Sequence, residues 1–203
     1  MRLFVALYPP EDARLELRQW LVAALARQGR TARLGPVERW HLTLAFLGDV
    51  LDQDRPEVER AISRAIRSTR RAPRFRLAGG GTFGGRSSAV WAALDGDLTR
   101  LRELHAELRR ALSAAGFRSD ERPLTPHLTV SYRGDQDVLA ALRDYSGPEW
   151  AATEIALVRS WFPRRQNYET LRTWPLAGAP AREESSQNRI SCNSTPQDRD
   201  KEM

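Results

Sequence analysis

The chain is 203 residues long, with 41% hydrophobic and 29% charged residues. This length and composition fit one globular domain, or two small lobes that share a core. The sequence holds no apolar run near the roughly 18 residues that a membrane span needs, so a transmembrane protein is not expected. Residues 1–10 contain too short an apolar stretch for a signal peptide and lack a small-residue cleavage site, so we expect a cytoplasmic protein.

The charge indicates which ligands the chain attracts, and the cysteine content excludes two kinds of structural site. The net charge is +6, and nearly all of the positive charge is arginine because Lys201 is the single lysine. A positively charged body favours a polyanionic or phosphorylated ligand by long-range attraction. The single cysteine, Cys192, excludes a disulfide framework and a cysteine-rich zinc site.

Helix and strand patterns alternate along the first 176 residues. Apolar residues recur every three to four positions, as in an amphipathic helix, over residues 12–28, 54–70, 97–115 and 136–145. Strand-like runs cover residues 3–7, 40–47, 75–77, 89–94, 127–132, 154–160 and 168–174. Residues 177–203 are polar and without periodicity, which predicts a disordered tail behind a domain of residues 1–176.

The order of these elements repeats. A strand, a helix, a histidine-bearing strand, a helix and a further strand are followed by the same five elements again. The distance from Leu3 to His41 is 38 residues, and the distance from Ala89 to His127 is the same. This repetition indicates an internal duplication, with two similar lobes that each contribute one histidine-bearing strand.

Two of the three histidines open nearly identical strands, with the sequences HLTL and HLTV. Because side chains alternate across a strand, His41 and Thr43 are predicted to share one face. His127 and Thr129 are predicted to share the corresponding face of the second strand. The other residues of the two strands are predicted to face the core: Leu42, Leu44, Phe46, Leu128, Val130 and Tyr132. If a pseudo-twofold axis relates the lobes, the two His/Thr faces meet across one cleft.

Two imidazoles and two hydroxyls around one cleft suit chemistry at phosphorus. Imidazole can give or take a proton near neutral pH, so two of them can act as acid and base in one turnover. Hydroxyl groups can donate hydrogen bonds to phosphate oxygens as negative charge develops. Two histidines fall short of the three or four ligands of a zinc site, so no metal is expected. The third histidine, His105, is predicted to be a surface or boundary residue of its helix.

The paired motifs resemble those of a known family, the two-histidine (2H) phosphoesterases, and within it the RNA 2′,3′-cyclic phosphodiesterases, also described as 2′–5′ RNA ligases. The likeness rests on residues 41–48 (HLTLAFLG) and 126–130 (PHLTV), supported by residues 2–7 and 168–176. It implies a bilobal α+β fold, a pseudo-twofold duplication with antiparallel sheets lining a central cleft and helices outside. It also implies metal-independent opening of a terminal 2′,3′-cyclic phosphate to a 2′-phosphate.

The same resemblance implies roles for four residues. His41 is expected to be the general acid that protonates the leaving 3′ oxygen. His127 is expected to be the general base that activates water, although the near-symmetry of the halves leaves this assignment open on the residues alone. Thr43 and Thr129 are expected to bind the phosphate oxygens.

Further side chains are candidates for substrate contact. The family commonly has an arginine five residues after the second histidine, where this chain has Tyr132, with Arg133 next. By strict alternation Arg133 shares the face of His127, so it is a candidate phosphate ligand. A group of aromatic and arginine residues could stack on an unpaired base: Trp161, Phe162, Arg164, Arg165 and Tyr168. The alternative in each case is an ordinary exposed or strand-end side chain.

Residues 79–84 (GGGTFG) match the dinucleotide-binding pattern G-x-G-x-x-G. The match fails on context, because the segment leads into a strand and does not open a helix. We therefore predict a flexible loop near the cleft. Contact of its backbone or of Phe83 with substrate is the less favoured alternative.

Together with these patterns, the resemblance leads us to expect a monomeric enzyme without a cofactor that acts on the 3′ end of RNA, or on an oligonucleotide, carrying a 2′,3′-cyclic phosphate. Two alternatives stay open. One is a non-catalytic module that holds nucleotide or RNA phosphate in the same cleft. The other applies the same chemistry to a small cyclic nucleotide or to a 2′–5′ linkage.

Overall fold

The computed structural model describes residues 1–31, 33–69, 71–84, 89–118, 122–132, 134–161 and 168–177. Within them the α-helices are α1 (Glu11–Ala26), α2 (Arg55–Ile66), α3 (Leu98–Ala114) and α4 (Gln136–Arg143). The strands are β1 (Arg2–Leu7), β2 (Leu42–Asp49), β3 (Arg74–Phe83), β4 (Ala89–Gly96), β5 (His127–Ser131), β6 (Trp150–Ala151), β7 (Glu154–Ser160) and β8 (Tyr168–Pro175). Two short 3₁₀ helices cover Val37–Arg39 and Asp52–Asp54. The predicted tail lies outside the described residues apart from Ala177, so the boundary at residue 176 stays a prediction.

The strands form two four-stranded antiparallel sheets, sheet A in the order β2-β1-β7-β8 and sheet B in the order β5-β4-β3-β6. Each sheet draws strands from both halves of the chain. The central strand β1 pairs with β7 from the second half, and the central strand β4 pairs with β3 from the first half. The bilobal α+β arrangement is therefore confirmed, with the last strand of each repeat, β3 or β7, exchanged into the other lobe.

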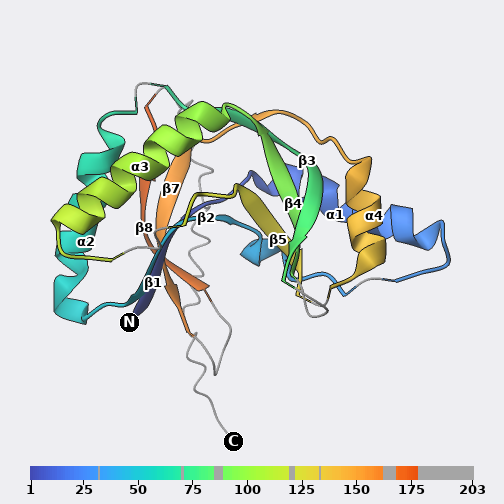
Figure 1. Cartoon of the computed structure of the whole chain (residues 1–203), viewed down its shortest axis with the longest axis horizontal. Helices are drawn as coiled ribbons and strands as arrows, with labels where there is room; N and C mark the ends of the chain where they lie inside the picture. Colours follow the sequence, from blue (N-terminus) through green and yellow to red (C-terminus); the bar gives the residue numbers. More distant parts are fainter. Residues whose placement is uncertain are drawn as a thin grey trace, which may run out of the picture.

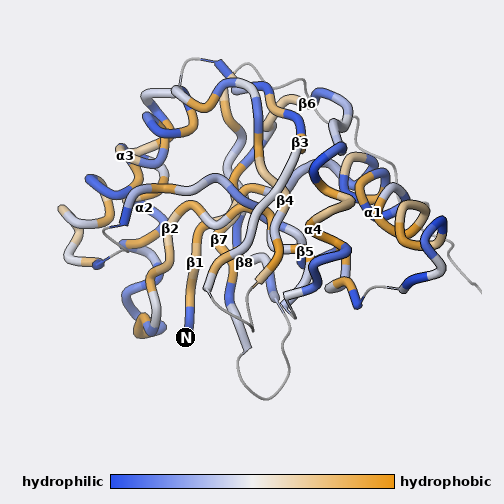
Figure 2. Tube along the Cα trace, turned by 45° about the vertical axis from the view of Figure 1, so that its right-hand side comes forward, coloured by the Kyte–Doolittle hydropathy of each residue, from blue (hydrophilic) through white to orange (hydrophobic). Residues whose placement is uncertain are grey.

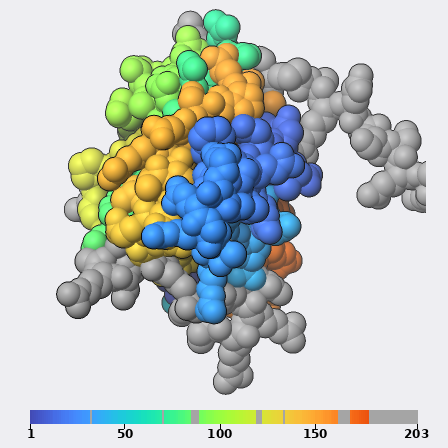
Figure 3. Space-filling model, turned by 90° about the vertical axis from the view of Figure 1, so that its right-hand side faces the viewer, coloured from blue at the N-terminus to red at the C-terminus, as the bar shows by residue number. Residues whose placement is uncertain are grey.

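The helices lie outside the sheets in two pairs (Figure 1). Helices α2 and α3 pack together beside sheet A, and α1 and α4 pack together beside sheet B. The indole Nε1 of Trp20 in α1 donates a hydrogen bond to the carbonyl oxygen of Ala141 in α4 at 3.0 Å. Figure 3 shows α1, in blue, lying against the yellow to orange residues of α4. The helix that follows each central strand thus crosses to the opposite sheet.

Strand β1 is the centre of sheet A. Its residues from Leu3 to Leu7 are all buried, and Figure 2 shows the strand as hydrophobic beyond its N-terminal end. Burial of both faces explains why this strand reads as a continuous apolar run and does not alternate. On one face lies a small apolar cluster of Phe4, Ala6, Ala156 and Val158, against which Tyr8 and Tyr168 pack. This cluster forms the floor beneath the first histidine.

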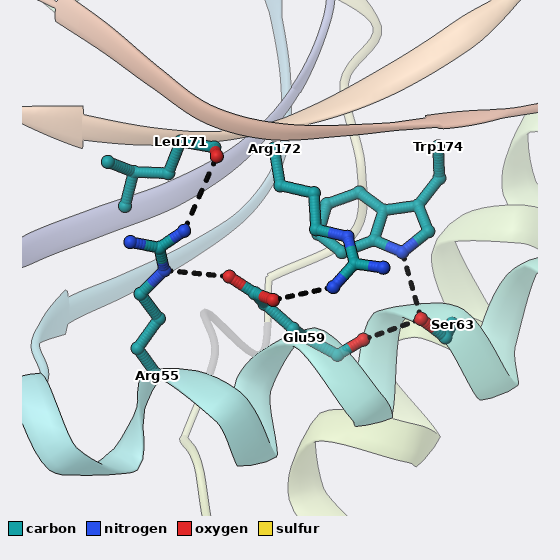
Figure 4. Close-up of polar contacts among 6 residues, drawn as sticks. All are labelled: Arg55, Glu59, Ser63, Leu171, Arg172 and Trp174. Carbon is teal, nitrogen blue, oxygen red and sulfur yellow. Dashed lines mark hydrogen bonds and ion pairs between the residues drawn. The ribbon is translucent and has the colours of Figure 1, made fainter.

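The last strand is tied to helix α2 by a polar network (Figure 4). The carboxylate of Glu59 accepts hydrogen bonds from Arg55 and from Arg172, each at 2.7 Å. The indole Nε1 of Trp174 donates to the hydroxyl of Ser63 at 2.8 Å, and that hydroxyl donates to the Glu59 carbonyl oxygen. Although burial raises the pKa of Glu59, the hydrogen bonds from the two arginines lower it overall.

The predicted loop at residues 79–84 is wrong, because residues 79–83 belong to strand β3 and only Gly84 lies beyond it. The glycines permit a close approach that other residues would block. A Cβ on Gly80 would lie 2.4 Å from the carbonyl oxygen of Trp91, and one on Gly81 would lie 2.4 Å from the Trp91 ring. The segment does lie at the cleft, as predicted. In the described part of the chain, no helix is both long enough and apolar enough to cross a membrane.

Candidate active site

The two histidines are held by the same local geometry. His41 follows the 3₁₀ turn Val37–Arg39 and immediately precedes β2, which begins two residues later than the strand predicted from residue 40, whereas His127 opens β5. The Nδ1 of His41 lies 2.6 Å from the carbonyl oxygen of Arg39, and the Nδ1 of His127 lies 2.7 Å from that of Thr125. Because a carbonyl oxygen only accepts, each Nδ1 carries the hydrogen. In the neutral rings Nε2 is therefore left to take a proton.

A β-bulge follows the threonine of the first motif. Thr43 pairs with Ala6, and Ala45 pairs with the preceding residue of β1, so Leu44 is an extra residue. A bulge of this kind reverses the alternation of side chains beyond it. Phe46 was predicted to face the core, but it lies on the cleft side and is 39% exposed. The prediction failed because it assumed unbroken alternation.

The second motif carries the equivalent bulge. Thr129 pairs with Trp91 and Ser131 with the preceding residue of β4, so Val130 is the extra residue. Ser131 is 1% exposed, and Tyr132 is 67% exposed where a core position was predicted. The bulge also removes the alternation argument for a role of Arg133. Arg133 itself lies outside the described residues.

A cavity of about 780 Å³ lies between the histidine-bearing strands. It is lined from β2 by Thr43 and Phe46, from the end of β3 by Phe83, and from β5 by His127. A smaller cavity of about 210 Å³ is lined by His41, and Thr43 and Phe46 line both cavities. The two histidines thus line two different cavities, and these cavities have Thr43 and Phe46 in common.

Thr129, the second predicted phosphate ligand, is placed less directly. It is half-buried and shares the strand face of His127. Among the described residues it is not one of those that line the larger cavity. Of the two threonine hydroxyls, that of Thr43 is therefore the better placed to reach a ligand in the cavities.

Aromatic rings surround His41. Phe4 stacks on it at 4.9 Å between ring centroids, Tyr168 meets it edge-on at 5.4 Å, and Tyr8 lies at 5.5 Å. The pKa of His41 is lowered to about 4, chiefly because burial disfavours the charged ring. Repulsion from a protonated His127 adds to the lowering of this pKa.

His127 is less enclosed. Phe83 meets it edge-on at 4.7 Å, and Trp91 lies at 6.0 Å. Its pKa is also lowered, because burial disfavours the imidazolium, while the hydrogen bond to the Thr125 carbonyl opposes that effect. Both histidines are therefore neutral in the free protein at pH 7 and can accept a proton.

Some of the predicted base-stacking residues can be placed. Tyr168 lies against His41, and the guanidinium of Arg39 lies 6.0 Å from the Tyr168 ring centroid. Trp161 is 46% exposed beneath the guanidinium of Arg159, at 4.6 Å. Phe162, Arg164 and Arg165 lie outside the described residues.

Sequence reasoning missed two ionisable residues of the larger cavity. His105 of α3 and Arg122 of the segment before β5 line its wall. His105 is half-buried, which fits the predicted boundary position, but its place at the cavity was not predicted. A signal existed, because His105 follows Leu104 and lies four residues after Leu101, at the border of the buried stripe of α3. Among the described residues no group of three or more His, Cys, Asp or Glu side chains could hold a metal ion.

Comparisons with known proteins agree with this geometry. Residues 9–160 match the family model described as the 2′-5′ RNA ligase superfamily. An RNA 2′,3′-cyclic phosphodiesterase of Geobacillus stearothermophilus is 34% identical over 70% of this chain, which spans about half of that relative (47%). An RNA 2′,3′-cyclic phosphodiesterase of Escherichia coli is 30% identical over 86% of this chain and 96% of its own length.

A solved structure shares the fold. The crystal structure of E. coli LigT complexed with ATP is 28% identical and superposes with a TM-score of 0.62, covering 87% of this chain and 98% of that one. The likeness therefore extends through both lobes and the cleft between them. With the family model matching most of the described residues, the resemblance seen in the paired motifs is confirmed: the chain belongs to the 2′-5′ RNA ligase superfamily.

Proposed function

We propose that the chain is a metal-independent RNA 2′,3′-cyclic phosphodiesterase in which His41 and His127 transfer the protons. The observation that carries the proposal is the pair of equivalent histidines on two cavities that share Thr43 and Phe46, each histidine with Nδ1 bound to a backbone carbonyl and Nε2 left for chemistry. The names of the relatives, and the binding of ATP by E. coli LigT, support a nucleotide phosphate as the ligand.

The reaction opens the cyclic phosphate at its 3′ side. A water molecule attacks phosphorus opposite the P–O3′ bond, and Nε2 of His127 accepts a proton from it. As the P–O3′ bond breaks, Nε2 of His41 donates its proton to the 3′ oxygen. The products are a 2′-phosphate and a free 3′-hydroxyl. Exchange of protons with solvent then returns both rings to their starting states.

The acid role requires His41 to be protonated when substrate is bound. In the free protein its pKa is about 4, so the ring is mostly neutral at pH 7. An anionic cyclic phosphate beside the ring favours the charged form and raises that pKa. Binding of substrate therefore supplies the condition for protonation, and burial among aromatic rings makes the imidazolium a ready proton donor.

The hydroxyls of Thr43 and Thr129 donate hydrogen bonds to the non-bridging oxygens of the phosphate in this proposal. Thr43 is supported by its place between the two cavities. Arg2 lines the smaller cavity with His41 and adds positive charge on that side. A contribution from Arg133, a cytoplasmic location and a monomeric state stay predictions from the sequence.

The test is a short RNA ending in a 2′,3′-cyclic phosphate, incubated with the protein in excess EDTA, with 2′- and 3′-phosphate products resolved by chromatography. We expect the 2′-phosphate alone, and its loss in His41→Ala and His127→Ala. Arg102→Gln, an exposed change on α3, serves as the control variant. Formation of 3′-phosphate, inactivation by EDTA or activity in either histidine variant would contradict the proposal. Nucleotide binding without turnover would favour the non-catalytic module.

A further inference from the structure

The larger cavity continues from the reaction centre to helix α3. Thr43 and His127 line it at the centre, and His105 and Arg122 line it as well. Neither His105 nor Arg122 is among the residues that line the smaller cavity with His41. At about 780 Å³ the cavity has the size that encloses most of a drug-sized ligand, which is more room than a cyclic phosphate needs.

His105 differs from the two motif histidines in its bonding. It is half-buried, and within the described part of the chain no hydrogen bond or ion pair is recorded for its ring. Burial lowers its pKa, and the neighbouring charge of Arg109 lowers it further. At neutral pH the ring is therefore uncharged, with one N–H to donate and one nitrogen to accept.

The rest of the cavity wall has two chemical characters. Phe46 and Phe83 expose 39% and 40% of their surface and, with Leu124, offer apolar contact to a nucleoside. Arg122 is exposed and brings positive charge to the same cavity. A hydrogen-bond donor and a guanidinium beside apolar contacts match an anionic oxygen attached to a nucleoside.

In an RNA chain, the next anionic group after the terminal cyclic phosphate is the phosphodiester on the 5′ side of the terminal nucleotide. We propose that His105 and Arg122 form a subsite for this phosphodiester, so that the enzyme selects RNA chains over cyclic mononucleotides. The inference rests on the proposed function. The terminal nucleoside then spans the cavity between the reaction centre and α3.

The test compares two small substrates that differ only at the 5′ position. One is adenosine 2′,3′-cyclic phosphate, and the other carries a 5′-methyl phosphate, which reproduces the single charge of a phosphodiester. For the wild type we expect kcat/KM to be roughly ten- to a hundredfold higher for the 5′-methyl phosphate, the usual effect of hydrogen bonds to a charged group. His105→Ala and Arg122→Ala should each lower this ratio severalfold.

Two further variants separate binding from a structural role. His105→Gln keeps a hydrogen-bond donor and should retain more of the ratio than His105→Ala. Arg102→Gln, on the same helix but outside the cavity, should leave the ratio unchanged. Because both substrates are measured in one sample, the ratio does not depend on the folded fraction.

The outcomes separate the two proposals. Equal kcat/KM for both substrates in the wild type, or an unchanged ratio in His105→Ala and Arg122→Ala, would overturn the subsite while leaving the proposed function standing. Absence of turnover with both of these substrates and with the short cyclic-phosphate RNA would overturn the proposed function itself.

Discussion

The two motif histidines occupy equivalent positions in the two lobes, yet their surroundings differ. Both rings are oriented by a hydrogen bond from Nδ1 to the carbonyl two residues earlier. His41 contacts three aromatic rings and has its pKa lowered to about 4, whereas His127 contacts two and lines the larger cavity. The repeated backbone therefore sets the orientation of both rings, and the packed neighbours set the proton affinity of each.

The largest expected effect tests whether the different surroundings make His41 the acid and His127 the base. His41→Ala and His127→Ala should each lower kcat for cyclic-phosphate RNA by about 10²–10⁴-fold. A phosphodiester with a p-nitrophenolate leaving group needs no acid, so His41→Ala should recover most of its loss on that substrate and His127→Ala should not. Steady-state rates on both substrates decide the matter. If His127→Ala alone regained activity on the p-nitrophenolate substrate, His127 would be the acid and His41 the base.

A second comparison concerns the two hydroxyls. Thr43→Val should lower kcat by about 10²-fold, because one hydrogen bond to the developing phosphate charge is lost while the side-chain shape is kept. We expect a smaller loss for Thr129→Val, since Thr43 is the one that lines both cavities. Thr99→Val, at an exposed position of α3, is the matched control. A larger loss for Thr129 than for Thr43 would show that the phosphate lies nearer to sheet B.

The pH dependence sharpens the comparison further. Since the pKa values of both histidines are lowered in the free protein, the maximum of kcat/KM should lie below pH 6.5. The profile falls at higher pH because the acid loses its proton, and at lower pH because the base gains one. The maximum of kcat should lie higher, because bound phosphate raises both pKa values. Profiles of kcat and kcat/KM measured in buffers of equal ionic strength check this, and a kcat/KM maximum above pH 8 would contradict it.

The smallest expected effect concerns stability in the lobe of His41. Ser63→Ala removes the partner of the Trp174 indole N–H and should lower the free energy of unfolding by about 1 kcal/mol. Since Ser63 lies outside both cavities, kcat should not change. Urea denaturation of this variant beside Ser113→Ala, an exposed serine of α3, provides the measurement. Equal stabilities would mean that the hydrogen bond contributes nothing measurable.

Much of the fold follows from the sequence because its signals are local. The helix periods, the strand runs and the repeated HLT motif each depend on neighbouring residues, and α3 was placed within one residue of its observed bounds at each end. The exchange of β3 and β7 between the sheets did not follow, because strand pairing depends on contacts far apart in the chain.

The site was predicted in part for the same reason. The motif histidines and threonines could be found because they repeat, but the positions of Phe46 and Tyr132 were wrong because a single bulge residue reverses every side chain beyond it. Strand β3 was missed over residues 79–83 because a glycine run usually indicates a loop, whereas here it admits the Trp91 ring. The place of His105 at the border of the buried stripe of α3 is a local signal, but which cavity that border faces depends on how the helix packs.

The exchange of strands also bears on how the protein is made. Sheet B is complete once residue 151 has been synthesised, but β1, which is synthesised before the other strands of both sheets, must wait for β7 and β8 before sheet A can close. Until then one edge of β1 lacks its partner strand. An exposed strand edge can form hydrogen bonds with the wrong strand or with another chain. Neither repeat holds a complete sheet of its own, so cutting the chain between β3 and β4 would leave two fragments that each need the other to fold.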